Sequence, residues 1–190
     1  LTKTKGCDII MAKVDRNGDL HSEANGQYVE KGNSDSKKSE LEKAKRYIFL
    51  EYFIISEGKM WSGILEILKR KAAQGVKVRV IYDDMGCFFR VPQKYYEQLK
   101  EYGIEGVAFN KFRPVITVDQ NNRDHRKIAV IDGKVAFTGG INIADEYINE
   151  IDRFGHWKYC GVSVHGKAAW SFTLMFLQMW DISKGIDEDY

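Results

Sequence analysis

The sequence contains few cysteines and few prolines, and it has no long apolar run. Its three cysteines, Cys7, Cys87 and Cys160, are odd in number and far apart, and no C-x-x-C pair occurs. This pattern disfavours a disulfide framework or a zinc site and favours unpaired, buried thiols in a reducing compartment. No run of about 18 apolar residues is present, so no membrane-spanning helix is predicted.

Net charge is also nearly absent. The 29 Lys and Arg residues against 27 Asp and Glu residues give a formal charge of +2. The protein as a whole is therefore not drawn to nucleic acid or to an anionic membrane, and any anion binding must be local. With 44% hydrophobic residues, the chain can bury a core, which excludes disorder.

The length of 190 residues suits one compact domain or one half of a larger enzyme. The chain starts at Leu1 without methionine or a signal-peptide pattern, so we expect a native beginning upstream. We predict a single domain over 1–190, with an irregular part over 1–46 and a core over 47–180. In the irregular part the patterns predict strands over 7–14 and 27–30 and a solvated helix over 34–46.

The core begins with a strand, a helix and a second strand. Residues 47–55 form a near-continuous apolar run, interrupted by Glu51, as expected for a strand that is covered on both faces. A helix over 61–73 and a strand over 76–82 complete a βαβ unit. Further strands are predicted over 104–109, 128–131, 135–138 and 159–165, and further helices over 93–102, 142–148 and 167–180. The predicted fold class is α/β, with a mixed β-sheet flanked by helices.

The last predicted helix, 167–180, is apolar nearly all round. Side chains on every side of a helix cannot all face one core. Either this helix is central to the domain, or part of it packs on a missing half, and we favour the second reading.

The segment from Asp124 to Asn142 carries the residues best suited to chemistry. His125 and Lys127 are two apart, so on a strand they share one face. An imidazole there can attack phosphorus while the ammonium group offsets charge on the phosphate oxygens. Asn142 follows Gly139 and Gly140, and its amide could donate to an oxyanion that the glycines allow to approach closely.

Each of these residues also has an ordinary explanation. A lone histidine such as His125 is usually structural, and a lone lysine such as Lys127 is usually solvated. Asp132 suits the first position of an Asp-Gly hairpin turn, and Asn142 suits the N-cap of a short helix. The prediction of phosphate chemistry therefore depends on finding these residues together in one segment.

That combination resembles a known family signature. His125, Lys127 and Asp132 fit the pattern H-x-K-x4-D, followed by Gly139-Gly140-x-Asn142, which resembles the motif of the phospholipase D superfamily. The segments FLEYFII, IYDDMG, FNKFRPV, NNRDHRKIAVIDG, TGGINIADEYIN, RFGHWK and SFTLMFLQMW are similar to bacterial cardiolipin synthase. They cover roughly 47–180.

The resemblance implies a phospholipase D-like half-domain that acts without metal or cofactor. Two such halves meet in one cleft, where one histidine attacks phosphatidylglycerol to form a phosphohistidine. The other histidine serves as acid and then as base, so that a second phosphatidylglycerol accepts the phosphatidyl group. By position this chain resembles the first half. The implied roles are nucleophile for His125, phosphate binding for Lys127, Gly140 and Asn142, and catalytic support for Asp132. Glu51 is a separate case: a carboxylate buried in an apolar strand needs a partner, so Glu51 either supports the phosphate site or pairs elsewhere.

Two departures qualify the resemblance. The chain has one HKD motif, so the second must come from another half or another copy, and the isolated chain is expected to be impaired. Tyr159 stands where relatives carry an aspartate that orients the histidine, which would indicate a degenerate site. The resemblance further implies a parent protein at the cytoplasmic face of the bacterial membrane, attached through segments outside this chain, with this fragment soluble.

Two other functions remain open. The first is a homodimeric single-motif nuclease of the same superfamily, which would need an extended basic groove. Nucleic acid is disfavoured because the nearby cations form only a local site: Lys111, Arg113, Arg123, Arg126 and Lys127. The second, indicated by Tyr159, is a catalytically dead binding or assembly module.

Two further segments also have two readings each. Asp83 and Asp84 follow a predicted strand, as ligand-binding residues do, but a solvated turn is an equal alternative. The aromatic residues of 87–91 either fold back on the core or contact lipid.

Overall fold

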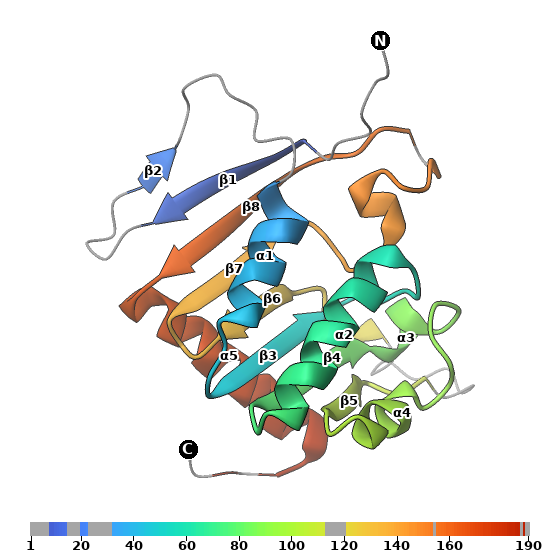
Figure 1. Ribbon diagram of the computed structural model, residues 1–190. Coiled ribbons are helices and arrows are strands. Elements are labelled where there is room, and N and C mark those ends of the chain that lie inside the picture. The colour runs from blue at the N-terminus through green and yellow to red at the C-terminus, as the bar shows by residue number, and fades with distance from the viewer. Residues whose placement is uncertain are drawn as a thin grey trace.

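The computed structural model describes residues 8–14, 20–22, 32–112, 121–153, 155–186 and 188. An eight-stranded mixed sheet in the order β2-β1-β8-β7-β6-β3-β4-β5 forms the centre of the molecule (Figure 1). The strands are β1 Asp8–Val14, β2 Leu20–Ser22, β3 Tyr47–Tyr52, β4 Lys77–Asp83, β5 Glu105–Phe109, β6 Lys127–Ile131, β7 Val135–Gly139 and β8 Lys158–His165. The helices are α1 Gly32–Glu42, α2 Lys59–Ala73, α3 Asp84–Cys87, α4 Tyr95–Glu101, the 3₁₀ helix η2 Asp145–Ile148 and α5 Lys167–Lys184.

The strand directions confirm the predicted mixed α/β class. Strands β3, β4 and β5 are parallel, and α2 makes the crossover from β3 to β4. Strands β6, β7 and β8 follow as an antiparallel meander beside β3, and β1 adds to β8 in parallel. The predicted Asp-Gly hairpin is present, since Asp132 and Gly133 have φ angles of 53° and 64° between β6 and β7. Glycine meets little steric cost at such a φ angle.

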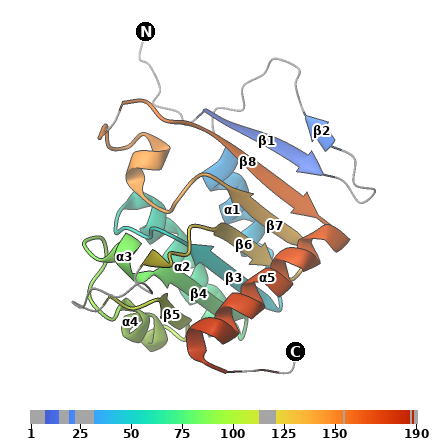
Figure 2. The same cartoon turned by 180° about the vertical axis from the view of Figure 1, so that it is seen from behind.

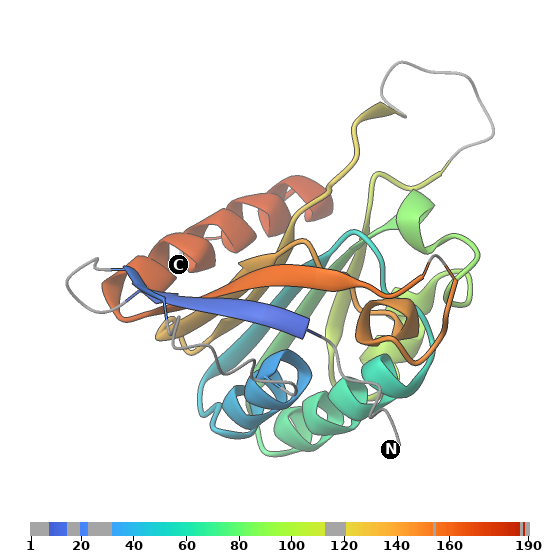
Figure 3. The same cartoon turned by 90° about the horizontal axis from the view of Figure 1, so that it is seen from above.

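Helices cover both faces of the sheet. Helices α1 and α2 lie on one face and α5 crosses the other, as Figures 2 and 3 show. Under α2, the side chains of Leu50, Trp61 and Leu68 are almost completely buried. Under α5, the rings of Phe49 and Phe176 stack with centroids 4.6 Å apart. Each face of the sheet therefore has its own apolar core.

Helix α5 buries only one side. Its buried residues are Ala169, Thr173, Phe176, Leu177 and Trp180. Trp170 and Leu174 on the other side are 50% and 45% exposed. The helix is therefore not central to this domain, and packing of its exposed side on a missing half stays a prediction.

The N-terminal part differs from the sequence prediction. Strand β2 was not expected, and the predicted strand over 27–30 lies outside the described residues. Helix α1 ends at Glu42, and it is not merely solvated because Leu41 is fully buried and Ala44 is 3% exposed. These residues join the core of 47–180, as β1 joins its sheet.

The topology brings the motif segments to one edge of the sheet. The carboxyl ends of the parallel strands β3, β4 and β5 lie at this edge. Strand β6 runs against β3, with Lys127 opposite Tyr52, so β6 begins there. The end of β7 and the first half of β8 also meet there, since Gly139 pairs with Gly161. No helix of the described residues is long and apolar enough to cross a membrane.

Candidate active site

His125 and Lys127 lie beside each other at this edge. The His125 side chain is exposed, whereas Lys127 is only 4% exposed. Lys127 Nζ donates to the backbone oxygen of His125 at 2.5 Å. Both side chains flank Phe53, whose ring centroid is 4.8 Å from that of His125 and 5.4 Å from Lys127 Nζ. A solvent-facing imidazole therefore stands next to a largely desolvated ammonium group.

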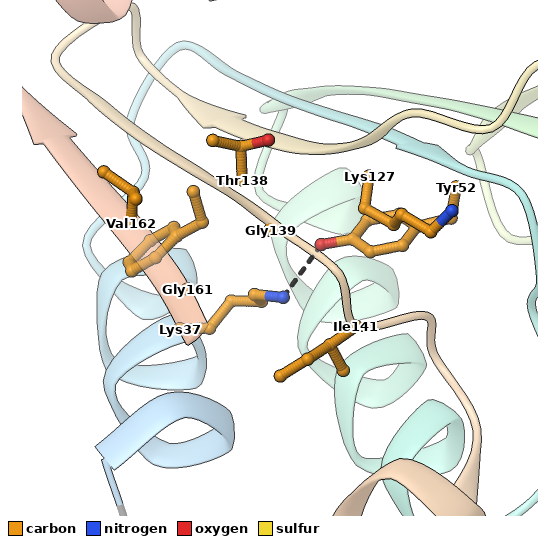
Figure 4. A pocket seen from close by; sticks show the side chains of 9 residues that line it. Lys37, Tyr52, Lys127, Thr138, Gly139, Ile141, Gly161 and Val162 are labelled. Atoms are coloured by element: carbon orange, nitrogen blue, oxygen red, sulfur yellow. Dashed lines mark hydrogen bonds between the residues drawn. The ribbon is translucent and has the colours of Figure 1, made fainter. Parts of the chain in front are cut away.

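A small cavity of about 10 Å³ lies next to Lys127, with room for about one water molecule (Figure 4). Lys37 enters it from α1 and donates to the hydroxyl of Tyr52 at 2.8 Å. Lys37 is itself only 4% exposed. The sequence did not indicate Lys37 or Tyr52, because Lys37 lies on a helix with few apolar residues and appeared solvated. Two buried lysines, Lys37 and Lys127, therefore give the cavity a cationic lining.

Burial changes the acidity of Lys127. Desolvation lowers its pKa from 10.5 to about 8, and the charge of Asp124 opposes this only in part. A desolvated ammonium group interacts more strongly with a phosphate oxygen than a solvated one does. Lys127 is thus suited to stabilise negative charge next to His125.

Asn142 is held more tightly than its sequence position indicates. Its Oδ1 accepts a hydrogen bond from Ile54 N at 3.0 Å, and its Nδ2 donates to Tyr147 Oη at 2.9 Å. The N-cap reading is wrong, since η2 starts at Asp145 with Ala144 as its N-cap. Phosphate binding by Asn142 stays a prediction, and the second N–H of its amide is the donor that would make this contact.

Gly140 lies in the exposed turn between β7 and Asn142. Its neighbour Gly139 lines the cavity beside Lys127, as Figure 4 shows. The turn is therefore next to the cationic cavity, and phosphate binding by Gly140 stays a prediction.

Asp132 lies at the opposite end of β6 from His125. Its Oδ1 accepts from the backbone N–H groups of Arg46 and Tyr47 at 2.8 and 2.9 Å, and its Oδ2 accepts from that of Lys45 at 2.9 Å. Burial would raise the pKa of this carboxyl, but the three hydrogen bonds hold it below its usual value. These contacts anchor the start of β3, and a catalytic role of Asp132 stays a prediction.

Glu51 supports the chain segment that carries His125. It is fully buried, and Arg126 Nε lies 2.7 Å from Glu51 Oε1. The same Nε donates to Asp124 Oδ1 at 3.1 Å. Asp83 holds the segment from the other side, because its Oδ2 accepts from Asp124 N at 3.1 Å. Glu51 therefore acts on the approach to β6 through Arg126, as a positioning residue would.

The buried position of Glu51 predicts a pH effect on stability. Burial first, and then Asp124, raise its pKa from 4.5 to about 9. The folded state thus retains a proton that the unfolded state loses, so stability is lost as pH rises from 4.5 through about 9. We measure the free energy of unfolding in urea at about pH 6 and at about pH 8. Over this range the free energy of unfolding of the wild type should fall by about 1–3 kcal/mol relative to that of Glu51→Gln.

The exposed Glu66 supplies a matched control for this prediction. Glu66→Gln should keep the pH dependence of the wild type. If the free energy of unfolding had the same pH dependence in Glu51→Gln as in the wild type, the assignment of a buried proton to Glu51 would be contradicted.

Asp83, at the end of β4, does not lie in a solvated turn. This residue is fully buried and caps α3 by accepting from Gly86 N at 2.9 Å. Helix α3 also packs against the candidate site, since a Cβ at Gly86 would lie 2.2 Å from the backbone oxygen of Phe53.

The Cys87 thiol is buried, which raises its pKa to about 12 and makes it unreactive. The predicted buried thiol is therefore confirmed for Cys87.

The backbone of Tyr159 lies in β8, paired with Ile9 of β1, but its side chain lies outside the described residues. The supporting role of Tyr159 thus stays a prediction. Among the described residues, no cluster of His, Cys, Asp and Glu is arranged to hold a metal ion.

A mixed sheet flanked by helices is the fold found in solved structures of the phospholipase D class. The phospholipase D family member Nuc from Salmonella typhimurium has this fold, with a TM-score of 0.56 at 16% sequence identity. The match covers 88% of this chain and 93% of that chain. Residues 38–152 match the family described as "Cardiolipin synthase, PLD-like domain", and the chain belongs to this family.

Two relatives show how much of a longer protein the chain resembles. A protein of Streptococcus mutans, described as uncharacterized, is 52% identical over 153 residues, 80% of this chain and 32% of its own length. A cardiolipin synthase of Geobacillus thermodenitrificans is 41% identical over 142 residues, 74% of this chain and 28% of its own length. The chain thus spans about a third or less of these relatives.

Proposed function

We propose that this chain is one half of an enzyme that transfers a phosphatidyl group between two phosphatidylglycerol molecules. The observation that carries this proposal is the exposed His125 beside the buried ammonium group of Lys127. Membership of the cardiolipin synthase family supports the choice of phosphatidylglycerol as substrate.

The reaction has two steps. His125 attacks the phosphorus of phosphatidylglycerol, the bond to the glycerol headgroup breaks, and a histidine of the second half donates a proton to the departing oxygen. That histidine then removes the proton from a hydroxyl of a second phosphatidylglycerol. This oxygen attacks the phosphohistidine, which releases cardiolipin and restores His125. Lys127 stabilises the negative charge on the phosphate oxygens in both steps.

The need for a second half is supported by the motif and by α5. The sequence has one HKD motif, and it spans 28% to 32% of the two relatives. The exposed side chains of Trp170, Leu174 and Met175 on α5 offer an apolar surface to a second half. In the absence of that half, a second copy of this chain is the alternative partner.

The arrangement of cations favours a lipid over a nucleic acid. Arg123 Nη1 contacts Asp83 at 3.3 Å, and Arg126 contacts Glu51 and Asp124. Among the described residues near His125, Asp83 and Asp124 neutralise these two arginines, which therefore form no extended basic groove. An exposed histidine beside a lysine also disfavours a catalytically dead module.

The proposal predicts that the isolated chain transfers phosphatidyl groups slowly. A missing acid–base partner costs about 10²–10⁴-fold in rate, so this chain should fall short of the complete two-half enzyme by about that factor. The measurement is formation of cardiolipin from phosphatidylglycerol in detergent micelles. Full activity in a chain shown to be monomeric by sedimentation would contradict the proposal.

A further inference from the structure

An aromatic patch is formed by α3, the loop after it and the segment after β5. It consists of Met85, Phe88, Phe89 and Phe112. Phe89 is 95% exposed, the highest value for a large apolar side chain among the described residues, and Met85 and Phe112 are 41% and 39% exposed. The ring of Phe88 joins the patch together, with centroids 4.8 Å from Phe89 and 5.2 Å from Phe112. Such a contiguous apolar surface on a folded domain indicates a binding function.

A groove of about 510 Å³ opens beside this patch. Its walls include Val91 and Tyr96, and Lys94 and Lys111 line it as well. Lys94 is largely exposed, and Lys111 lies over the ring of Tyr96 with Nζ 4.6 Å from the centroid. The volume is within the usual range of ligand pockets. The groove therefore combines an apolar wall with two cations, of which Lys94 pairs with Glu97 at 3.9 Å, and with the carboxylate of Asp84.

The aromatic patch adjoins the candidate active site. Asp84 Oδ2 accepts from Phe112 N at 2.7 Å, which ties the segment after β5 to α3. Helix α3 packs on Phe53, and Phe53 contacts the ring of His125. A surface that binds the aromatic patch would consequently lie next to the exposed imidazole.

We propose that the aromatic patch, with Lys94 and Lys111, docks on an anionic phospholipid bilayer. This inference rests on the proposed function, because a lipid substrate lies in such a bilayer. Aromatic side chains insert at the boundary between headgroups and acyl chains, and neighbouring lysines attract anionic headgroups. The patch therefore brings His125 to the phosphodiesters at the surface, and the groove beside it accommodates one acyl segment.

The test is sedimentation of the whole chain with vesicles of phosphatidylglycerol and phosphatidylcholine in equal parts. Phe89→Ser should reduce partitioning about tenfold, since it removes one aromatic ring from the lipid. Lys94→Glu combined with Lys111→Glu should reduce binding to these vesicles and have little effect on vesicles of phosphatidylcholine alone. Ile182→Ser, at a 69% exposed position on α5, is the matched control and should bind like the wild type.

Three results would overturn the inference. These are equal partitioning of Phe89→Ser and the wild type, a dimer in lipid-free sedimentation that Phe89→Ser dissociates, and DNA binding that needs the two lysines. Failure of the proposed function can be told apart from failure of the docking surface, because vesicle binding is measured without turnover. Conversely, transfer in detergent micelles together with unaltered vesicle binding by Phe89→Ser would retain the function and reject only the docking surface.

Discussion

Replacing His125 with alanine in the complete two-half enzyme is expected to lower phosphatidyl transfer by about 10⁴-fold or more. The imidazole supplies the attacking nitrogen, so its removal leaves no covalent intermediate, and loss of a nucleophile has effects of this size in other enzymes. His125 is exposed, so the substitution should leave the fold intact. The measurement is initial rates of cardiolipin formation in detergent micelles.

An exposed histidine elsewhere in the chain provides the control. His156 lies in the loop before β8, and His156→Ala should keep most of the activity. A His125→Ala enzyme that retains a tenth or more of the wild-type rate would show that another group is the nucleophile.

Replacing Lys127 with methionine is expected to lower the transfer rate by about 10²–10³-fold. The substitution retains much of the side-chain volume but removes the charge that offsets the phosphate oxygens. Because the pKa of Lys127 is about 8 rather than 10.5, wild-type activity should also decline as pH rises through about 8. Lys127→Met should lack this decline, and the ratio of the two rates should therefore shrink above about pH 8.

Lys134 in the turn between β6 and β7 is the matched control, since it is exposed at the opposite end of the same hairpin. Lys134→Met should keep both the rate and the pH profile of the wild type. Equal losses in the two methionine variants would mean that the charge of Lys127 has no specific role.

The strands of the sheet could be predicted from the sequence because their signals are local. The apolar run of β3 and the Asp-Gly turn between β6 and β7 each define an element without reference to the rest of the chain. The spacing of His125 and Lys127 predicted a shared strand face, but β6 begins at Lys127, so His125 precedes the strand. Strand β2 carries no such signal over its three residues and was missed.

Contacts between distant residues could not be predicted in this way. Asp132 accepts hydrogen bonds from N–H groups 85 to 87 positions earlier in the chain. Lys37 reaches Tyr52 only because α1 docks on the sheet. From the local sequence, Asp132 is interpreted as a turn residue and Lys37 as a solvated lysine. The further contacts of both residues arise only when α1 and β3 pack in the folded chain.

The account depends most on a phosphorus–nitrogen bond to His125. The direct measurement is mass spectrometry of peptides from the complete enzyme, quenched in base during turnover of phosphatidylglycerol. We expect a phosphatidyl adduct on the peptide that contains His125, and none in the His125→Ala enzyme. An adduct on a histidine of the second half, with the His125 peptide unmodified, would contradict the assignment of His125 as the nucleophile.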